Sequence, residues 1–194
     1  MRVAVSVAAL AVGATLATAA CGGAGDPGES GPNFIAFAPD FAGFHDWPSS
    51  VAGAPDAGPG QPEPADAGVF SDGGVHDPAV AKTVFIKLPV GAVVDSEFPL
   101  GTIIVKEIDG GELTTRKIFA MVKRGGGYNR SGATNWEWFE LENIDAASAR
   151  IRWRGVGPPA GEMYGGDKGG CNPCHSQAIA NDFVMSATLD LSRF

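Results

Sequence analysis

The sequence predicts a β-rich α+β fold, in which an antiparallel sheet of about five strands carries an N-terminal helix and a C-terminal helical segment. Two observations predict it. Short apolar runs separated by Gly, Pro, Asn and Asp occupy the chain after residue 79, as strands joined by turns do. Before them, aromatic residues recur every three or four positions, which is the helical period. With 44% hydrophobic residues, the 194-residue chain can bury one modest core.

The chain begins with the features of an export signal. Residues 1–20 have one early arginine, an uncharged Ala- and Val-rich stretch and small residues at the end, which is typical of a signal peptide. Cys21 follows directly and opens a Gly-rich tether over residues 21–33, an arrangement that resembles a bacterial lipoprotein signal, in which the cysteine is acylated. Thr18 replaces the leucine usual in such signals, so cleavage without acylation stays open. We expect an exported bacterial protein, either periplasmic or attached to the outer membrane by its lipid.

The net charge of -8 belongs to one part of the chain. Residues 22–78 contain nine acidic residues and no Lys or Arg, whereas residues 79–194 contain 13 of each sign. An acidic chain without a basic surplus repels the phosphates of nucleic acid. Nucleic acid is therefore excluded as a partner, and the C-terminal part is close to neutral.

One domain is predicted over residues 34–194. Five aromatic residues near its start would line one face of a short helix: Phe34, Phe37, Phe41, Phe44 and Trp47. Residues 49–78 follow with much Ala, Gly, Pro and Asp and no apolar period, so we expect a disordered acidic loop there.

Strands are expected where apolar, β-branched and aromatic residues gather in short runs. Five ranges meet this description: 83–88, 101–108, 117–123, 136–141 and 150–154. The last range alternates most regularly, with three arginines on one side and Ile and Trp on the other, as a half-solvated strand does. Beyond these strands, the residues after His175 are expected to form one or two helical turns.

Near the C-terminus, Cys171-Asn172-Pro173-Cys174-His175 forms the run C-x-x-C-H. In such a run two thiols can form thioethers to the vinyl groups of one haem, and the histidine can ligate the iron. The predicted cofactor is one covalently attached haem c, with Cys171 and Cys174 as attachment points and His175 as the proximal ligand. Export agrees with this, because covalent haem attachment takes place outside the cytoplasm.

Three other uses of these cysteines have less support. A zinc site needs about four ligands, and the chain has no second C-x-x-C and only His45 and His76 besides His175. A thioredoxin-type dithiol would follow a strand of a parallel α/β fold, whereas a Gly-rich loop precedes Cys171. A disulfide between Cys171 and Cys174 would leave the adjoining histidine without a role.

The second axial position of the iron decides what such a haem can do, because an electron-transfer cytochrome closes it with Met or His. The candidates in this chain are Met121, Met163, Met185, His45 and His76. Met121 lies in an apolar strand, where Met is more often core filler than ligand, but Met163 lies in a Gly-rich segment and keeps the electron carrier open. An open distal site is favoured, and with it the binding of small molecules.

One lysine breaks the pattern of its strand. Alternation along residues 101–108 places Lys106 on the same side as Ile104 and Ile108. Such a lysine either extends its amine to solvent at a sheet edge or is kept there for a purpose, and periodicity alone favours the first interpretation.

Several short motifs together resemble the cytochrome P-460 family and the related beta-type cytochromes c-prime. The shared segments span roughly residues 80–185 and agree in order and spacing. They are Phe98-Pro99-x-Gly101-Thr102 with Val105-Lys106-Glu107, Ala120-Met121-Val122-Lys123, Asn135-Trp136 with Phe139, and Cys171-Asn172-x-Cys174-His175 with Asn181-Asp182-Phe183-Val184.

The resemblance implies a β-rich, often dimeric fold with a five-coordinate haem c. In the cytochrome P-460 branch a lysine is also bonded to the porphyrin edge, and the enzyme oxidises hydroxylamine, with nitric oxide chemistry at the same iron. By its position in the strand, Lys106 corresponds to this cross-linking lysine. The resemblance therefore outweighs the interpretation of Lys106 as a solvent-directed side chain.

Two positions depart from the family's pattern. Phe119 stands where the resemblance places a distal carboxylate that relays protons, and a phenyl ring cannot accept a proton. Lys82 stands where active members tend to carry a pocket arginine, whose planar fork a lysine lacks. Phe119 and Lys82 are thus expected in the distal pocket, and Glu97, Glu107 and Glu137 are the candidates for a replacement base.

The functional prediction is a monohaem cytochrome that binds or redox-transforms a small nitrogen species, hydroxylamine or nitric oxide, and exchanges electrons with a redox partner protein. The loss of the carboxylate leaves open whether the protein is an enzyme. The alternatives are a non-enzymatic binder of nitric oxide or carbon monoxide, which an apolar distal side suits, and a simple electron-transfer cytochrome. A homodimer is the oligomer that the resemblance suggests.

Overall fold

The computed structural model of the chain describes residues 31–52, 81–108, 116–145, 147–162, 170–186 and 188–194. Several sequence predictions therefore lie outside the described residues. They are the signal peptide, Cys21 and nearly all of the tether, most of the acidic loop, His76 and Met163.

The described part of the chain is mostly β-structure. Six strands form one sheet in the order of the sequence, and each is antiparallel to its neighbours. The strands are β1 (Ser49–Ala52), β2 (Lys82–Lys87), β3 (Ile103–Ile108), β4 (Lys117–Lys123), β5 (Trp136–Asn143) and β6 (Ala149–Gly155). The predicted antiparallel sheet is confirmed, but it has six strands instead of five.

The additional strand is β1, which occupies the first four residues of the range expected to be a disordered loop. It pairs with the edge of β2, with Ser49 opposite Phe85 and Ala52 opposite Lys82. The sequence pattern does not reveal β1, because an edge strand can be held by the backbone groups of its neighbour without an apolar period of its own. The Ser50 hydroxyl also donates to that of Thr188 at 2.7 Å.

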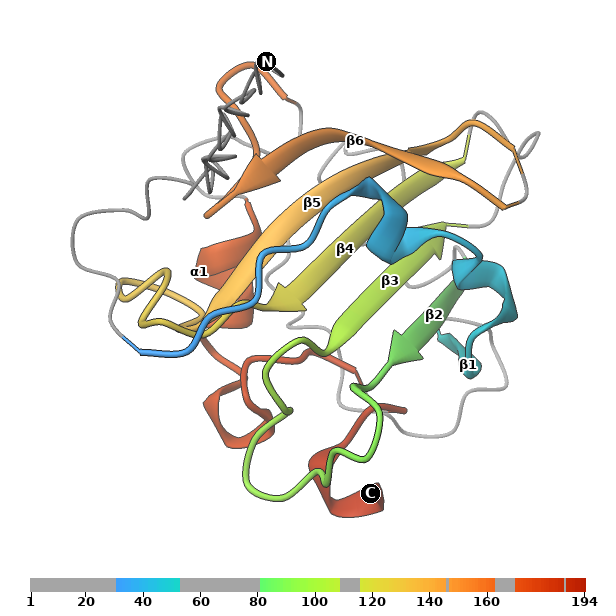
Figure 1. Ribbon diagram of the computed structural model, residues 1–194. Coiled ribbons are helices and arrows are strands. Elements are labelled where there is room, and N and C mark those ends of the chain that lie inside the picture. The colour runs from blue at the N-terminus through green and yellow to red at the C-terminus, as the bar shows by residue number, and fades with distance from the viewer. Residues whose placement is uncertain (1–30, 53–80, 109–115, 146, 163–169, 187) are drawn as a thin grey trace, which may run out of the picture.

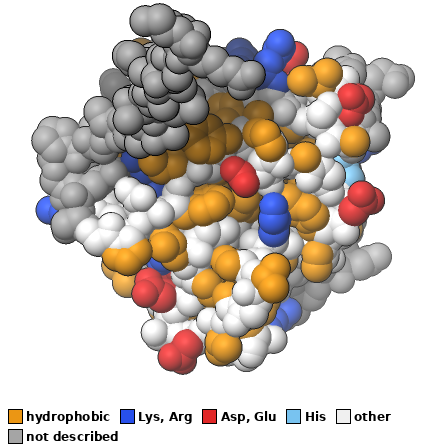
Figure 2. Space-filling model, viewed as in Figure 1, with side chains coloured by type: hydrophobic (Ala, Val, Ile, Leu, Met, Phe, Trp, Pro, Cys, Tyr) orange, Lys and Arg blue, Asp and Glu red, His pale blue; other side chains and the backbone are white. Residues whose placement is uncertain are grey.

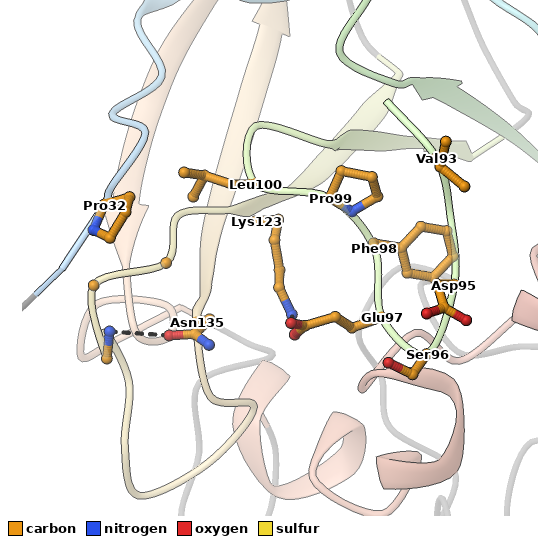
Figure 3. Close-up of a pocket in the computed structure, with 13 residues that line it drawn as sticks. Pro32, Val93, Asp95, Ser96, Glu97, Phe98, Pro99, Leu100, Lys123 and Asn135 are labelled. Carbon is orange, nitrogen blue, oxygen red and sulfur yellow. Dashed lines mark hydrogen bonds and ion pairs between the residues drawn. The ribbon is translucent and has the colours of Figure 1, made fainter. Parts of the chain in front are cut away.

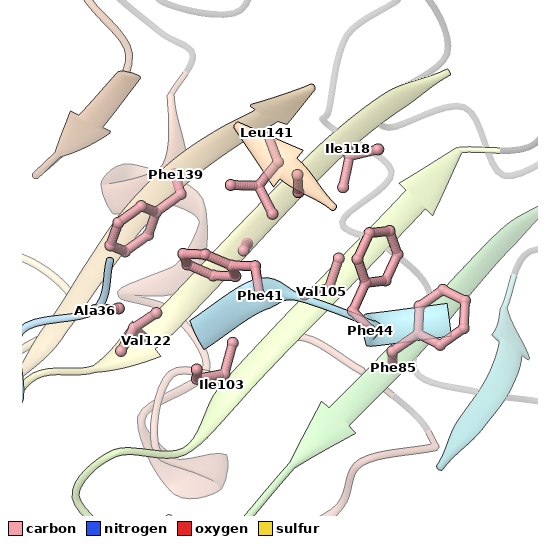
Figure 4. Close-up of a cluster of buried hydrophobic side chains, with 12 residues drawn as sticks. Ala36, Phe41, Phe44, Phe85, Ile103, Val105, Ile118, Val122, Phe139 and Leu141 are labelled. Carbon is pink, nitrogen blue, oxygen red and sulfur yellow. The ribbon is translucent and has the colours of Figure 1, made fainter. Parts of the chain in front are cut away.

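The aromatic segment does not form the single helix that its spacing predicts. It makes two short 3-10 turns, η1 (Ala38–Phe41) and η2 (Phe44–Asp46), separated at Gly43, whose φ of 65° interrupts a helix. Phe41 and Phe44 are buried against the sheet, whereas Phe37 is 62% exposed. The five aromatic side chains thus do not share one buried face, although the two turns lie across the strands as a helix would (Figure 4).

The sheet is covered on both sides (Figure 1). The N-terminal face packs against residues 34–47, and its core consists of Ala36, Phe41, Phe44, Phe85, Ile103, Val105, Ile118, Ala120, Val122, Phe139, Leu141 and Ala149. The C-terminal face packs against the chain from residue 171 onward, and its core consists of Val84, Ile86, Phe98, Ile104, Met121, Ala133, Trp136, Trp138, Val184 and Leu189. Strand alternation assigns each sheet residue to one of these two faces.

Seen from the N-terminal side, apolar side chains are scattered over the surface and the charged ones stand singly, without a large patch of one sign (Figure 2). Among the described residues, no helix is both long and apolar enough to cross a membrane.

Candidate functional site

The C-x-x-C-H run forms the short helix α1 (Cys171–His175), which lies on the C-terminal face. A 3-10 turn, η4 (Ile179–Asn181), follows, and a further one, η5 (Leu191–Arg193), ends the chain. The C-terminal helical segment thus consists of three separate short turns. Cys171 and Cys174 are not joined by a disulfide, and both are partly exposed.

The orientation of the His175 ring suits a haem ligand. Its Nδ1 lies 2.7 Å from the backbone oxygen of Phe183, and since a carbonyl can only accept, Nδ1 carries the hydrogen. In this tautomer the lone pair is on Nε2, the nitrogen that can bind a metal while Nδ1–H is held by a second partner. The ring also packs on the indole of Trp138, with 4.4 Å between the ring centroids.

Lys106 lies close enough to α1 to act on Cys171. Burial raises the pKa of the Cys171 thiol to about 12, and the positive charge of Lys106 is the first influence that opposes this rise. The sequence prediction of a lysine on the same side of the sheet as apolar residues agrees with this placement. Lys106 and α1 therefore share the C-terminal face.

The strand register places Lys106 and Phe119 in one row across the sheet, whereas Lys82 pairs with Ile108, two residues away from this row. Lys106 on β3 is directly opposite Phe119 on β4, and Phe119 is directly opposite Glu140 on β5. The row continues to Trp153 on β6. Since neighbouring strands are about 4.8 Å apart, the Cα atoms of Lys106 and Glu140 are separated by about 10 Å, with Phe119 between them.

Exposure varies along this row, because Glu140 is buried whereas its neighbours are partly exposed. Lys106, Phe119 and Trp153 are each partly exposed, whereas Met121 and Trp138, further along the same strands, are buried. Lys82, the first residue of β2, lies on the same face and is only 4% exposed. The structure thus brings Lys82, Lys106 and Phe119 to one face of the sheet.

Glu140 is the residue that sequence reasoning missed. Its side chain is buried, and both of its oxygens are held: Oε2 accepts from Trp153 Nε1 at 2.7 Å, and Oε1 accepts from Arg152 at 2.8 Å. Alternation with Trp136 and Trp138 already assigns Glu140 to their side of β5. The sequence does not show the register between β4 and β5, which places Glu140 opposite Phe119.

The three glutamates proposed as replacement bases lie elsewhere. Glu107 and Glu137 point to the N-terminal face, where Glu107 binds His45 and Arg116 and Glu137 binds Arg124 and Arg154. Glu97 is on a loop, is 63% exposed and binds Lys123. These predictions are wrong for Glu107 and Glu137, because alternation turns both carboxylates away from Phe119.

The structure places the residues considered as a sixth iron ligand in different parts of the fold. His45 Nε2 is 2.8 Å from Glu107 Oε2 on the N-terminal face, so the sheet separates it from His175. Met121 is buried in the core of the C-terminal face, which agrees with its interpretation as core filler. Met185 is partly buried in the segment after Phe183.

A pocket of about 570 Å³ opens at the far end of β4 (Figure 3). It is lined by Glu97, Phe98, Lys123, Asn135 and the glycines at 125–127, among others. Lys123 extends toward Glu97 and also binds the buried Asp182 at 2.6 Å, so its charge is neutralised within the protein. Four residues of strand, about 13 Å, separate Lys123 from Phe119, so this pocket is distinct from the row.

The described residues contain no group of three or more His, Cys, Asp or Glu side chains that could hold a metal ion, so the zinc alternative gains no support. Comparisons with protein-family models, with curated proteins and with solved structures each gave no match to this chain. What can be said of function therefore depends on the geometry described above.

The raised pKa of Cys171 leads to a direct test in the haem-free chain. A pKa raised from 9.0 to about 12 leaves much less thiolate at pH 8, and the thiolate is the reactive form. We expect iodoacetamide to alkylate Cys171 more slowly in the folded chain than in denaturant, by at least about a hundredfold, as measured by peptide mass spectrometry. Equal rates in both states would contradict the burial of this thiol.

Proposed function

We propose that this protein is an exported monohaem c-type cytochrome of the cytochrome P-460 kind, which binds or redox-transforms a small nitrogen species at an open distal haem site. Hydroxylamine and nitric oxide are the ligands proposed, and a redox partner protein would exchange electrons with it. A periplasmic or lipid-anchored location, acylation of Cys21 and a homodimer belong to the same proposal. The family assignment is supported by the motif pattern in the sequence.

The observation that carries the proposal is that the C-x-x-C-H helix lies on the same face of the sheet as Lys106, Phe119 and Lys82. The attachment helix, the row from Lys106 to Trp153 and the buried Lys82 all belong to the C-terminal face. A haem bound there would be held by Cys171 and Cys174 and ligated by His175 Nε2. When bound, it would supply an iron that can change its oxidation state and bind a small molecule.

Lys106 is the proposed covalent link to the edge of the haem. Its charge acts on Cys171, one of the two attachment thiols, so its amine lies near the place where the macrocycle would be joined to the chain. Phe119, directly opposite on β4, would restrict the space above the iron to small ligands.

The position of the Glu140 carboxylate favours turnover of the ligand over binding alone. Oxidation of hydroxylamine releases protons, and a carboxylate within reach can accept them. Glu140 is adjacent to Phe119 in the row, and its oxygens accept hydrogen bonds from Arg152 and Trp153, which hold the carboxylate in place. Glu140 would thus supply, one strand further along the sheet, the carboxylate that position 119 lacks.

A non-enzymatic gas binder is the second candidate, and Phe119 favours it. An apolar side chain such as Phe119 in the distal pocket would exclude charged and strongly hydrated ligands, whereas nitric oxide and carbon monoxide are small and weakly polar. Because Glu140 already accepts hydrogen bonds at both oxygens, it could instead serve only to hold β6 in place. The simple electron carrier stays a third candidate through Met163.

The absorption spectrum of the full chain, expressed with haem-attachment machinery, tests the proposal. We expect one haem per chain by intact mass, a carbon monoxide adduct of the ferrous form, and a red-shifted band that ordinary haem c lacks. A ferrous form that refuses carbon monoxide would favour the electron carrier. A chain that carries no covalent haem would refute the proposal as a whole.

The cross-link is tested separately with Lys106→Ala and with peptide mapping of the parent protein. We expect the peptide that contains Lys106 to remain joined to the haem peptide after proteolysis, and the red-shifted band to disappear in the variant. Lys87→Ala, a change at an exposed lysine on β2, is the matched control and should leave the spectrum as in the parent. A released Lys106 peptide would show that no cross-link forms.

A further inference from the structure

Asn172, inside the attachment helix, has an unusually well-bound side chain. Its Oδ1 accepts from Trp138 Nε1 at 3.1 Å, from the backbone N–H of Ala133 at 3.3 Å and from Asn129 Nδ2 at 2.5 Å. An indole and a backbone N–H can only donate, so the atom that faces them must be the oxygen of the amide. The orientation of Asn172 is thereby determined by its neighbours.

Asn129 completes a reciprocal amide pair with it. Asn172 Nδ2 donates to Asn129 Oδ1 at 2.6 Å, while Asn129 Nδ2 also contacts the carbonyl oxygens of Ala133 and Trp136 at 3.1 and 3.3 Å. Asn129 is buried and has a φ of 57°, a left-handed conformation that Asn tolerates better than most residues. Asn172 is thus bound to the connection between β4 and β5.

Gly132 leaves the room that this contact needs. A Cβ atom at position 132 would lie 2.5 Å from Asn172 Cγ, closer than atoms can pack. Its φ lies outside the left-handed range, so a glycine is required here for space and not for backbone conformation. The β4–β5 connection is therefore shaped to receive the Asn172 side chain.

Trp138 connects this arrangement to His175. Its indole N–H binds Asn172, and its ring packs on the imidazole at 4.4 Å. Positions 172 and 175 are three apart in the helix and so lie on the same side of it. A movement of Asn172 would therefore release both the helix and the ring that supports the proximal histidine.

We infer that Asn172 is a positioning residue for the proximal haem ligand, acting through Trp138 and anchored by Asn129 beside Gly132. We call the contacts of Asn172 with Trp138 and Asn129 the clamp. The inference rests on the proposed function, because only a bound haem makes His175 a ligand that the clamp can position. Partners in the second coordination shell set ligand orientation and commonly change affinity or activity by 10- to 100-fold. The clamp would thus adjust how strongly the iron holds His175 and a small molecule opposite to it.

The test compares haem-loaded Asn172→Ala with the parent protein and with Gln177→Ala. The Gln177 side chain is exposed and donates to the backbone oxygen of Pro173 at 3.2 Å, and within the described residues it makes no hydrogen bond with Asn172, Asn129 or Trp138. We expect Asn172→Ala to shift the reduction potential and the ferrous iron–histidine stretching band and to change the carbon monoxide dissociation constant about tenfold. Gln177→Ala should match the parent in all three measurements.

Three further variants keep the test decisive. Gly132→Ala should reproduce the effects of Asn172→Ala by pushing the amide out of its place, whereas Gly157→Ala, where nothing lies within 4 Å of the new methyl, should have no effect. If Asn172→Ala does not fold, Asn172→Asp serves instead, because it keeps the acceptor and loses the donor to Asn129.

The outcomes separate this inference from the proposed function. A parent protein without covalent haem would overturn both. A loaded parent and loaded Asn172 and Gly132 variants with identical potentials, stretching bands and carbon monoxide affinities would overturn the clamp alone. A loaded parent with the expected shifts in these variants and not in the controls would support it.

Discussion

Glu140→Gln is expected to lower the turnover of hydroxylamine by a factor of about 100 to 10,000, the usual contribution of a positioned acid or base. Gln keeps an oxygen acceptor for Arg152 or Trp153 but cannot take up a proton at neutral pH. Binding of carbon monoxide and nitric oxide should be retained, because neither needs a base. The measurement is steady-state oxidation of hydroxylamine with an artificial electron acceptor under anaerobic conditions.

Glu142→Gln is the matched control for this variant. It makes the same chemical change two residues further along β5, at an exposed carboxylate paired with the exposed Arg150. Its turnover should equal that of the parent protein. Unchanged turnover in Glu140→Gln would exclude Glu140 as the base, and a parent protein that binds nitric oxide without any turnover would favour the gas binder.

Lys123→Met is expected to reduce the free energy of unfolding by about 3–5 kcal/mol, the cost of removing one partner from a buried ion pair. Lys123 Nζ lies 2.6 and 2.7 Å from the two oxygens of Asp182, and only 4% of the lysine side chain is exposed. In the variant, Asp182 keeps its bond from the Phe98 backbone N–H but loses its cation. Urea unfolding followed by tryptophan fluorescence measures the difference.

The size of this loss should depend on pH. Burial raises the pKa of Asp182 above its ordinary value of 3.8, and the bonds from Lys123 are the main influences that oppose the rise. Without Lys123 the folded-state pKa rises further, so the native state binds more protons than the unfolded state. Stability then falls as pH increases from about 4 through the raised pKa, so the deficit should be small near pH 4 and largest at neutral pH.

Lys87→Met is the control for Lys123→Met. Lys87 also lies over an aromatic ring, that of Trp47 at 5.1 Å, but its side chain is exposed. Its replacement should change the unfolding free energy by less than about 1 kcal/mol at any pH, as for other exposed charges. An equal loss in both variants, or a loss at position 123 that does not vary with pH, would contradict the account of the buried pair.

The amino-acid pattern was informative where the relevant interactions are local. Alternation assigned Lys106 to the side of Ile104, and the structure places it on the face that also carries α1. The C-x-x-C-H run defined the candidate ligands by itself, because its chemistry depends on residues three or four positions apart. The predicted strand ranges also correspond to β2–β6 within two residues.

Prediction failed where partners are distant in the chain. The aromatic spacing favoured a single helix, but the turn at Gly43 and the contact of His45 with Glu107 across 62 positions produce two short turns instead. Glu107 and Glu137 were considered as bases although alternation turns them toward the N-terminal face. Their charges are satisfied there by His45, Arg116, Arg124 and Arg154, which no local pattern reveals.

The sequence alone therefore predicted the mostly β-class and the side of its strand on which Lys106 lies, and it contains the C-x-x-C-H run, since each follows from neighbours along the chain. Only the tertiary structure decided that Phe119 lies between Lys106 and Glu140, and that Asn172 binds the β4–β5 connection. The physical reason is register. A strand's own pattern tells which face a side chain occupies, but which residues lie opposite one another depends on packing and turns along the whole sheet.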